Sequence, residues 1–292
     1  MKVLVIGCGG QLGSDFTTLC KKGGHDVTAL DYPQVDITDQ KQLLPIVTSC
    51  APQVIVNCAA FTNVDLCETQ EHLAFELNAS GPRNLALCAQ QTDSLLVHFS
   101  TDYVFDGLGS RPYTENDQPS PATAYGRSKL QGEKNIADIL DNHMIFRIAW
   151  LYGNNGSNFV KTIRRAALKN KDLNQPLNVV ADQIGTPTWT VDVCKQVLTI
   201  MKGDQRGIFH CTSEGECSWY DFAVEILKAA SIPVEVKPCT TDQFPRPAQR
   251  PPFSVLKNER LQELGKNTMP QWVDGFIKFL QSENRTKGEI AQ

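Results

Sequence analysis

The sequence predicts an α/β fold, with a doubly wound parallel sheet and a smaller α/β domain interleaved toward the C-terminus. Short apolar runs typical of buried strands alternate with helical segments through the first half of the 292-residue chain. The first such run passes into a glycine-rich turn and then a helix, the order found where parallel sheets bind phosphate groups. A chain of this length holds about two modest domains.

The composition argues against several classes of protein. The net charge is −4 and no long like-charged run occurs, so nothing indicates binding to nucleic acid or to an anionic membrane. No apolar run approaches the ~20 residues of a membrane span, and the chain enters a strand at its start, so we expect a cytoplasmic protein. The ten cysteines are scattered through apolar segments without a Cys-x-x-Cys pair, which favours reduced, mostly buried thiols.

The first strand is predicted at 2–6 and the first helix at 14–22, with glycines at three positions of the turn between them. Gly7, Gly10 and Gly13 permit a tight turn, let a pyrophosphate approach the backbone and bring helix against strand. The helix N-terminus offers N–H donors and the positive end of a dipole. The turn alone is a weak signal, and the following strand strengthens the prediction of a Rossmann-type dinucleotide site.

That second strand, predicted at 25–30, delivers Asp31 at its C-terminal end. A carboxylate there accepts hydrogen bonds from the adenosine ribose hydroxyls and repels a 2′-phosphate. No Arg follows; the next residues are Tyr32 and Pro33. The sequence therefore predicts NADH rather than NADPH as cofactor, the alternative being that Asp31 is a solvated acid in a turn.

The alternation of strand and helix then continues. Small residues after the third strand, Ala59 and Ala60, leave room for an adenine or a ribose near the backbone, or serve only to pack a helix on the strand. In order, we expect a helix at 40–49 distorted at Pro45, a strand at 53–58, a helical stretch at 71–91 and a strand at 95–101.

Acid–base chemistry is indicated where the fourth strand and the next helix meet. Thr101 ends the apolar run, and Tyr125 and Lys129 stand four residues apart in a predicted helix that continues to about residue 140. Residues four apart lie on one helical face, so an ammonium below the phenol would lower the phenol pKa from ~10 toward the working range. The three groups predict a proton shuttle beside a bound nicotinamide.

The remainder of the chain is less regular. Arg246 and Arg250 lie in a proline-stiffened segment, and a guanidinium suits a diphosphate. We predict that Arg250 contacts a nucleotide diphosphate, the alternative being an ordinary surface salt bridge. The other expected elements are a loop at 106–123, a strand at 143–149, a basic helix ending near 171, turns at 179–188, a helix at 191–201, a strand at 207–211 and a helix capped by Ser218.

Several separated motifs together resemble the extended short-chain dehydrogenase/reductases. They are the glycine pattern at 7–13, Ser-Thr-Asp-Tyr-Val-Phe at 100–105 and Tyr-x-x-x-Lys at 125–129. Segments at 180–188, 207–210 and 218–220, with Arg-Pro-x-x-Ser-x-Leu at 250–256, narrow the resemblance to the dTDP-4-dehydrorhamnose reductases over nearly the whole chain.

The resemblance implies NAD(P)H-dependent reduction of the C4 ketone of dTDP-4-dehydro-6-deoxy-L-mannose to dTDP-L-rhamnose. Tyr125 would donate the proton, Thr101 would hydrogen-bond the carbonyl oxygen, and Lys129 would hold the nicotinamide ribose and depress the pKa of Tyr125. The implied sugar-nucleotide contacts are Thr101, Asp102 and Trp150, besides Arg250. The cofactor contacts, besides Gly7, Gly13, Tyr125 and Lys129, are Gly10, Gln11, Leu12, Asp31, Asp36, Ile37, Ala60, Phe61, Thr62 and Phe99.

The chain departs from the family pattern in two places. Cys8 stands in the pyrophosphate turn, which makes that turn potentially oxidisable. Some members bridge a magnesium ion with acidic side chains at a dimer contact, whereas residues 189–192 carry no matching cluster. We therefore expect no metal, and either a monomer or a homodimer.

Two other functions are compatible with the motifs. One is a dehydratase or epimerase of the same superfamily, and a dehydratase would place an acid where Tyr103 stands. A non-catalytic NAD(P)-binding subunit similar to the β subunit of methionine adenosyltransferase would share the same motifs, but Trp150 suits a reductase better. The predicted dinucleotide domain is 1–152 with about 186–212, the sugar-nucleotide domain is about 153–185 with 213–282, and residues 283–292 form a frayed tail.

Overall fold

A six-stranded parallel sheet forms the centre of the computed structural model, which describes the backbone of residues 1–290 and the side chains of residues 1–284. The strand order is β10-β5-β4-β3-β1-β2, which confirms the predicted doubly wound sheet. The chain moves from β1 to β2 on one side and then crosses back to β3 on the other. The strands are β1 (Lys2–Ile6), β2 (Asp26–Leu30), β3 (Val54–Asn57), β4 (Leu95–Thr101), β5 (His143–Ile148) and β10 (Gly207–His210).

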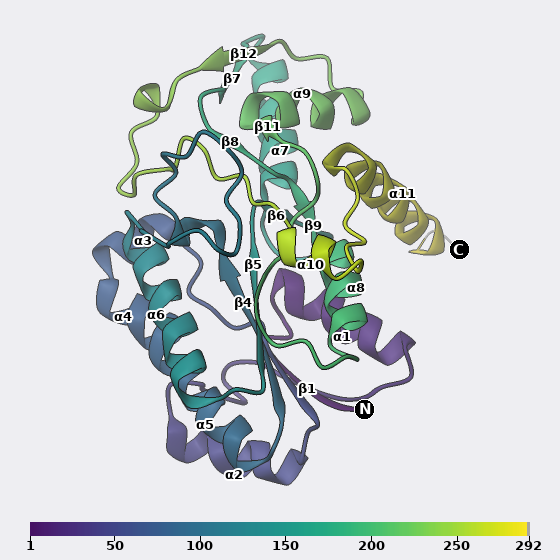
Figure 1. The fold of residues 1–292 in the computed structure, drawn as a ribbon. Helices are drawn as coiled ribbons and strands as arrows, with labels where there is room; N and C mark the ends of the chain where they lie inside the picture. The colour runs from purple at the N-terminus through teal and green to yellow at the C-terminus, as the bar shows by residue number, and fades with distance from the viewer. Residues whose placement is uncertain (291–292) are drawn as a thin grey trace.

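Helices cover both faces of this sheet, as Figure 1 shows. One face packs against α1 (Gln11–Lys22) and α8 (Thr190–Ile200). The other face packs against α2 (Gln40–Cys50), α5 (Gly81–Gln91) and α6 (Ala124–Ile139). Alternate residues of each strand enter the two cores, because successive side chains of a strand point to opposite faces.

Short helices connect β3 to α5. They are α3 (Val64–Thr69), α4 (Glu71–Phe75) and a π-helical segment (Glu76–Ser80) that leads directly into α5. The sequence predicted one helical stretch here, and the structure adds the π segment within it. A single turn of π-helix shifts the register of the side chains that follow, and such turns are frequent at functional sites.

A second core lies above the carboxyl edge of the sheet (Figure 1). It is built by Tyr152, Phe222, Phe276 and Phe279, with aliphatic side chains from the same region. Its helices are α7 (Phe159–Asp172), α9 (Trp219–Ala229) and α11 (Trp272–Ile290). The strand pairs of this region are β6 (Leu151–Tyr152) with β9 (Thr188–Trp189), β7 (Leu177–Val180) with β12 (Val236–Cys239), and β8 (Ile184–Gly185) with β11 (Cys217–Ser218), and the short helix α10 (Glu259–Glu263) packs on the sheet core instead.

The two parts interleave along the chain. The strand at Gly207–His210 returns to the sheet beside β5, as expected from the sequence. Leu261 and Met269, from the segment predicted to belong to the second domain, pack into the sheet core instead. The division into two domains stays a prediction.

Some boundaries differ from those expected. Helix α1 begins at Gln11, three residues before the predicted start, because Gly10 takes an extended conformation at its N-cap. Helix α11 continues to Ile290, so most of the predicted tail is helical backbone, while residues 291 and 292 lie outside the described residues. Ser218 caps α9 through a full capping box, as predicted.

The cysteines are unpaired, as expected, and all except Cys8, Cys50 and Cys58 are buried. Within residues 1–290, no helix is both long and apolar enough to cross a bilayer. The same described part of the chain holds no group of three His, Cys, Asp or Glu side chains placed to bind a metal ion.

Candidate active site

Strand β4 and helix α6 bring three predicted site residues together. Thr101 is the last residue of β4, and Tyr125 and Lys129 lie on the first turns of α6. Thr123 caps this helix by accepting a hydrogen bond from the Gly126 amide at 3.0 Å. Gly126 sits against the backbone carbonyl of Tyr103, where a Cβ would collide with it, so the helix start packs directly on the segment after β4.

Tyr125 is half-buried, and the neighbouring Thr101 side chain acts to lower the pKa of its phenol. Its ring packs edge-on against Tyr103, with ring centroids 5.6 Å apart. Burial raises the pKa of Tyr125, so the direction expected from the sequence is wrong for this structure. The phenol therefore keeps its proton through the neutral range, which is the form that can donate it.

Lys129 is only 1% exposed, and its ammonium nitrogen faces β4. Nζ lies 2.5 Å from the carbonyl oxygen of Phe99 and 3.3 Å from Nε2 of His98. Burial lowers the pKa of Lys129 to about 8. The expected arrangement had the ammonium act on the phenol, whereas its hydrogen bonds in the structure run to β4.

The hydroxyl of Thr101 donates to Asp102 Oδ1 at 2.9 Å and accepts from the amide of Tyr103 at 3.2 Å. Asp102 is buried, and burial raises its pKa from 3.8 to about 6. A buried carboxyl group thus lies beside the Thr101 hydroxyl.

The glycine turn lies at the carboxyl end of β1, next to β3. Gly7 has a φ of +81°, and a Cβ at this residue would lie 2.6 Å from the backbone nitrogen of Ala59. The N-cap residue of α1 is Gly10, which makes no side-chain capping hydrogen bond among the described residues. An uncapped N-terminus beside a close-packed glycine fits a diphosphate group.

Asp31 lies beside this turn. Its carboxylate accepts from the amide of Gly9 at 2.8 Å and from the amide of Tyr32 at 2.8 Å. Asp36, the other predicted acid, accepts from the amide and hydroxyl of Thr38 at 2.9 and 2.7 Å. The turn, with Asp31 at the end of the neighbouring strand, therefore has the polar groups that a dinucleotide requires.

The other predicted cofactor residues differ in exposure. Leu12, Ile37 and Phe99 are buried in the sheet cores, so only their backbone atoms are placed to meet a ligand. Ala60 and Phe61 are half-buried and Thr62 is exposed in the segment that follows β3. Gln11 is the first residue of α1, and its side-chain oxygen accepts from Asn158 at 2.8 Å, which ties the turn to the second part of the protein.

Sequence reasoning did not find three buried polar residues that support the site. Asn78, in the π segment, bonds the amide of Phe61 at 2.9 Å and Ser128 Oγ at 3.1 Å, so it joins the segment after β3 to α6. Asn57 and His98 form the chain that reaches Lys129. A polar residue inside an otherwise apolar strand was the available signal for the last two.

Two other predicted sugar-nucleotide residues, Trp150 and Arg250, make contacts within the protein. Trp150 has a φ of +47° and stacks on Trp219, with ring centroids 3.3 Å apart and planes 4° from parallel. Arg250 Nη2 pairs with Asp65 at 2.9 Å, and its Nη1 lies 3.2 Å from the Tyr103 hydroxyl. The structure thus shows an ion pair at Arg250 and connects it through Tyr103 to the ring of Tyr125.

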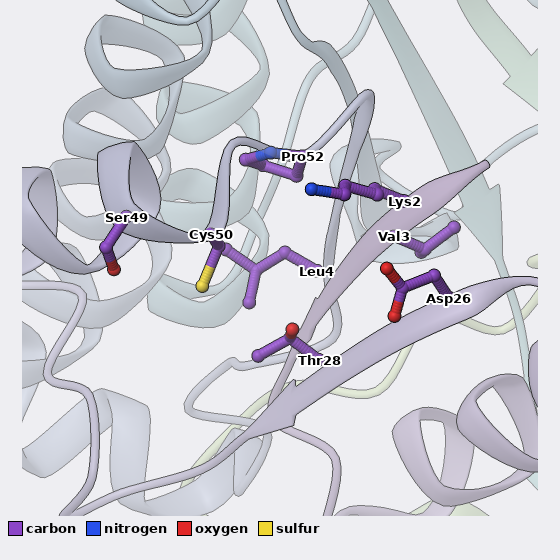
Figure 2. A pocket seen from close by; sticks show the side chains of 8 residues that line it. All are labelled: Lys2, Val3, Leu4, Asp26, Thr28, Ser49, Cys50 and Pro52. Carbon is purple, nitrogen blue, oxygen red and sulfur yellow. The ribbon is translucent and has the colours of Figure 1, made fainter.

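A separate depression lies at the opposite end of the sheet (Figure 2). Lys2 and Asp26, which line it, open β1 and β2, so it borders the amino ends of the strands. It contains none of the predicted site residues. A smaller depression near Tyr103 and Thr123 borders the candidate site.

The comparisons with known proteins agree with this geometry. The family model described as "RmlD substrate binding domain" matches residues 1–285. The spore coat polysaccharide biosynthesis protein SpsK of Bacillus subtilis is 38% identical, over 97% of this chain and 98% of the relative. The dTDP-4-dehydrorhamnose reductase of Aggregatibacter actinomycetemcomitans is 39% identical, over 90% and 92%.

Solved structures give the same result. A dTDP-4-dehydrorhamnose reductase from Clostridium acetobutylicum is 42% identical with a TM-score of 0.94, covering 97% of this chain and 100% of that one. The Bacillus anthracis enzyme, solved in complex with NADP, is 36% identical with a TM-score of 0.93 over the same shares. The chain therefore belongs to the RmlD substrate binding domain family, together with the dTDP-4-dehydrorhamnose reductases.

Proposed function

We propose that this chain is a dTDP-4-dehydrorhamnose reductase, which reduces the C4 ketone of dTDP-4-dehydro-6-deoxy-L-mannose to give dTDP-L-rhamnose. The observation that carries the proposal is the meeting of Thr101, Tyr125 and Lys129 at the carboxyl edge of the sheet that also bears the glycine turn. Relatives at 35–39% identity carry that enzyme's name.

Tyr125 is the proton donor in this proposal, because burial keeps its phenol protonated. Thr101, whose hydroxyl donates to Asp102 in this structure, would turn that proton to the same carbonyl oxygen and orient it. A bound dihydronicotinamide would supply the hydride. Lys129 would hold the ribose of the dinucleotide, and a proton on its amine would stabilise the phenolate that remains on Tyr125.

The cofactor is a nicotinamide dinucleotide, and we propose NADH as the preferred one. Asp31 supports this choice, because its carboxylate lies against the amide of Gly9 and would repel a 2′-phosphate placed there. The relative solved with NADP makes NADPH the competing candidate. We also propose that residues 153–185 and 213–282 hold the sugar nucleotide, with contacts from Asp102, Trp150 and Arg250.

A second substrate has a specific observation in its favour. A protein named dTDP-4-keto-6-deoxy-D-glucose reductase, from Streptomyces niveus, is 38% identical over 94% of this chain. The same proton donor and hydride geometry would serve either ketone. A dehydratase is less well supported, because the position where it would need an acid holds Tyr103, whose hydroxyl accepts a hydrogen bond from Arg250.

The test is to mix the purified protein with each keto sugar and with NADH or NADPH. We expect one reduced dinucleotide to be consumed for each dTDP-L-rhamnose formed, with the L-sugar ketone preferred and NADH giving the higher kcat/KM. Consumption only with the D-sugar ketone would move the assignment to the second substrate. Turnover without net consumption would indicate a dehydratase or epimerase, and no consumption with either sugar would favour a non-catalytic subunit.

A further inference from the structure

A row of buried polar side chains runs from β3 to the lysine of the site. Asn57 and His98 are paired residues of β3 and β4, and Lys129 on α6 lies beyond His98. All three are 1% exposed. Buried polar groups need hydrogen-bond partners of the right kind, so the donors and acceptors of this row can be assigned from its contacts.

The assignment begins at Asn57. The amide of Ala59 can only donate, and it lies 3.1 Å from Asn57 Oδ1. The other end of the Asn57 side chain is therefore its NH₂ group, which lies 3.1 Å from Nδ1 of His98. Nδ1 must accept this hydrogen bond. Burial lowers the pKa of His98, so the ring is neutral and carries its proton on Nε2.

That proton points at Lys129. Nε2 of His98 lies 3.3 Å from Nζ of Lys129, whose second contact is the Phe99 carbonyl at 2.5 Å. An ammonium has three donors and no acceptor, so it would face the Nε2–H of His98 donor to donor. A neutral amine accepts from His98 and donates to Phe99, which satisfies both contacts.

We propose that Asn57 and His98 are positioning residues for Lys129: Asn57 selects the Nε2–H form of His98, and this Nε2–H disfavours the ammonium form of the lysine relative to its amine form. The inference rests on the proposed function, because it assigns a purpose to the lysine of that site. Its consequence is a lysine that exchanges a proton with its surroundings in the working range. When Tyr125 has given up its proton, the resulting phenolate lies on the same helix as a lysine that can take up a proton and become charged.

The other ionisable groups around Lys129 do not explain a preference for its amine form. Glu133, on the same helix, is held by Arg147 through hydrogen bonds of 3.0 and 2.7 Å. Burial raises the pKa of the Cys58 thiol and of the Tyr125 phenol, which keeps both neutral. Burial is the largest cause of the lowered pKa of Lys129, whereas Glu133 and Cys58 act to raise it.

The direct test is to determine which nitrogen of the His98 ring carries the proton in the parent protein. Long-range proton–nitrogen spectra of protein labelled at histidine, with His98→Phe to assign the signal, should show a neutral ring protonated on Nε2. The Nε2 signal should shift as Lys129 titrates near pH 8. A ring protonated on Nδ1, a charged ring, or an Nε2 signal unaffected by that titration would overturn the proposal. None of these readings depends on catalysis.

The variant Asn57→Asp tests whether the proton position on His98 sets the pH at which Lys129 titrates. An aspartate keeps the acceptor for Ala59 but makes His98 protonate Nδ1, which leaves Nε2 free to accept from an ammonium. The titration of Lys129, and the alkaline fall of kcat/KM, should move up by about one pH unit or more. Asn57→Asp with His98→Phe keeps the added charge and removes the ring. An equal shift in the double variant would assign the effect to charge alone and contradict the proposal.

Discussion

Three ionisable side chains of the candidate site, Asp102, Tyr125 and Lys129, are held toward their neutral forms by burial. The motifs identified all three from the sequence, and they lie together in the fold. The direction in which the pKa of Tyr125 shifts could not be predicted from the motifs. It depends on how deeply Tyr103 and α6 bury the phenol, and that depth is set by packing between segments far apart in the chain.

Asp102 allows the effect of burial on stability to be measured. Its pKa rises from 3.8 to about 6 on folding, so the folded protein binds more protons than the unfolded chain between these values. The stability that this group contributes is present below the lower value and is lost as the pH rises through the upper one. The full difference corresponds to about 3 kcal/mol.

Asp102→Asn cannot ionise and keeps an oxygen to accept from Thr101. Relative to the parent, the variant should therefore gain stability between about pH 4 and neutrality, by up to about 3 kcal/mol in the free energy of unfolding from urea titrations. Asp117→Asn is the control, because Arg111 holds the pKa of that carboxyl below its ordinary value and its removal should cost stability at neutral pH. If the free energy of unfolding depended on pH equally in the parent and in Asp102→Asn, the argument that burial raises the pKa of Asp102 would be contradicted.

At the scale of single elements, the glycine turn was predictable from spacing because its geometry is local. The start of α1 at Gln11 was predicted less well, since the extended Gly10 that begins the helix leaves no polar side chain as a signal. The π segment before α5 was not predicted, because its sequence is compatible with an ordinary helix. Asn78, which joins two walls of the site, was missed with it.

Gly7→Ala tests the turn. The added Cβ meets the backbone of Ala59 and also requires a left-handed φ of +81°. Gly24→Ala is a matched control, because Gly24 has a φ of +73° and open space around its Cβ position. Both should lose about 1 kcal/mol or more of stability from strain, with the larger loss at Gly7. Only Gly7→Ala should weaken NADH binding, measured by fluorescence titration; equal affinities in the two variants would count against a dinucleotide at this turn.

The segment around Arg250 tests the sugar-nucleotide side. Arg250 is one-fifth exposed, at 22%, and bonds Asp65 and Tyr103, whereas Arg246 is 60% exposed and lies 4.0 Å from Asp65. Arg250→Ala should raise KM for the sugar nucleotide by about tenfold or more, the effect of losing a charge-assisted hydrogen bond. Arg246→Ala should change it far less. An unchanged KM in Arg250→Ala would leave its ion pair with Asp65 as a structural contact only.

At the scale of the whole molecule, the site depends on contacts between distant parts of the chain. Asn158 bonds Gln11 at the start of α1, and Thr190 bonds Asp15 one turn further along that helix. The packing of α1 and α8 on one face of the sheet brings these regions together (Figure 1). The sequence predicted that the strand at 207–211 returns to the sheet. It carried no signal that Leu261 and Met269 complete the same core, because such contacts have no local pattern.

The central claim is that Tyr125 gives its proton to the reduced ketone while the rest of the site binds the two substrates. Its most direct test is the rate of a single turnover with Tyr125→Phe, together with the dissociation constant for the reduced dinucleotide. The account predicts a loss of rate of about a hundredfold to ten-thousandfold, because a general acid is removed, with the dissociation constant little changed. A variant that reduces the ketone as fast as the parent would contradict the account.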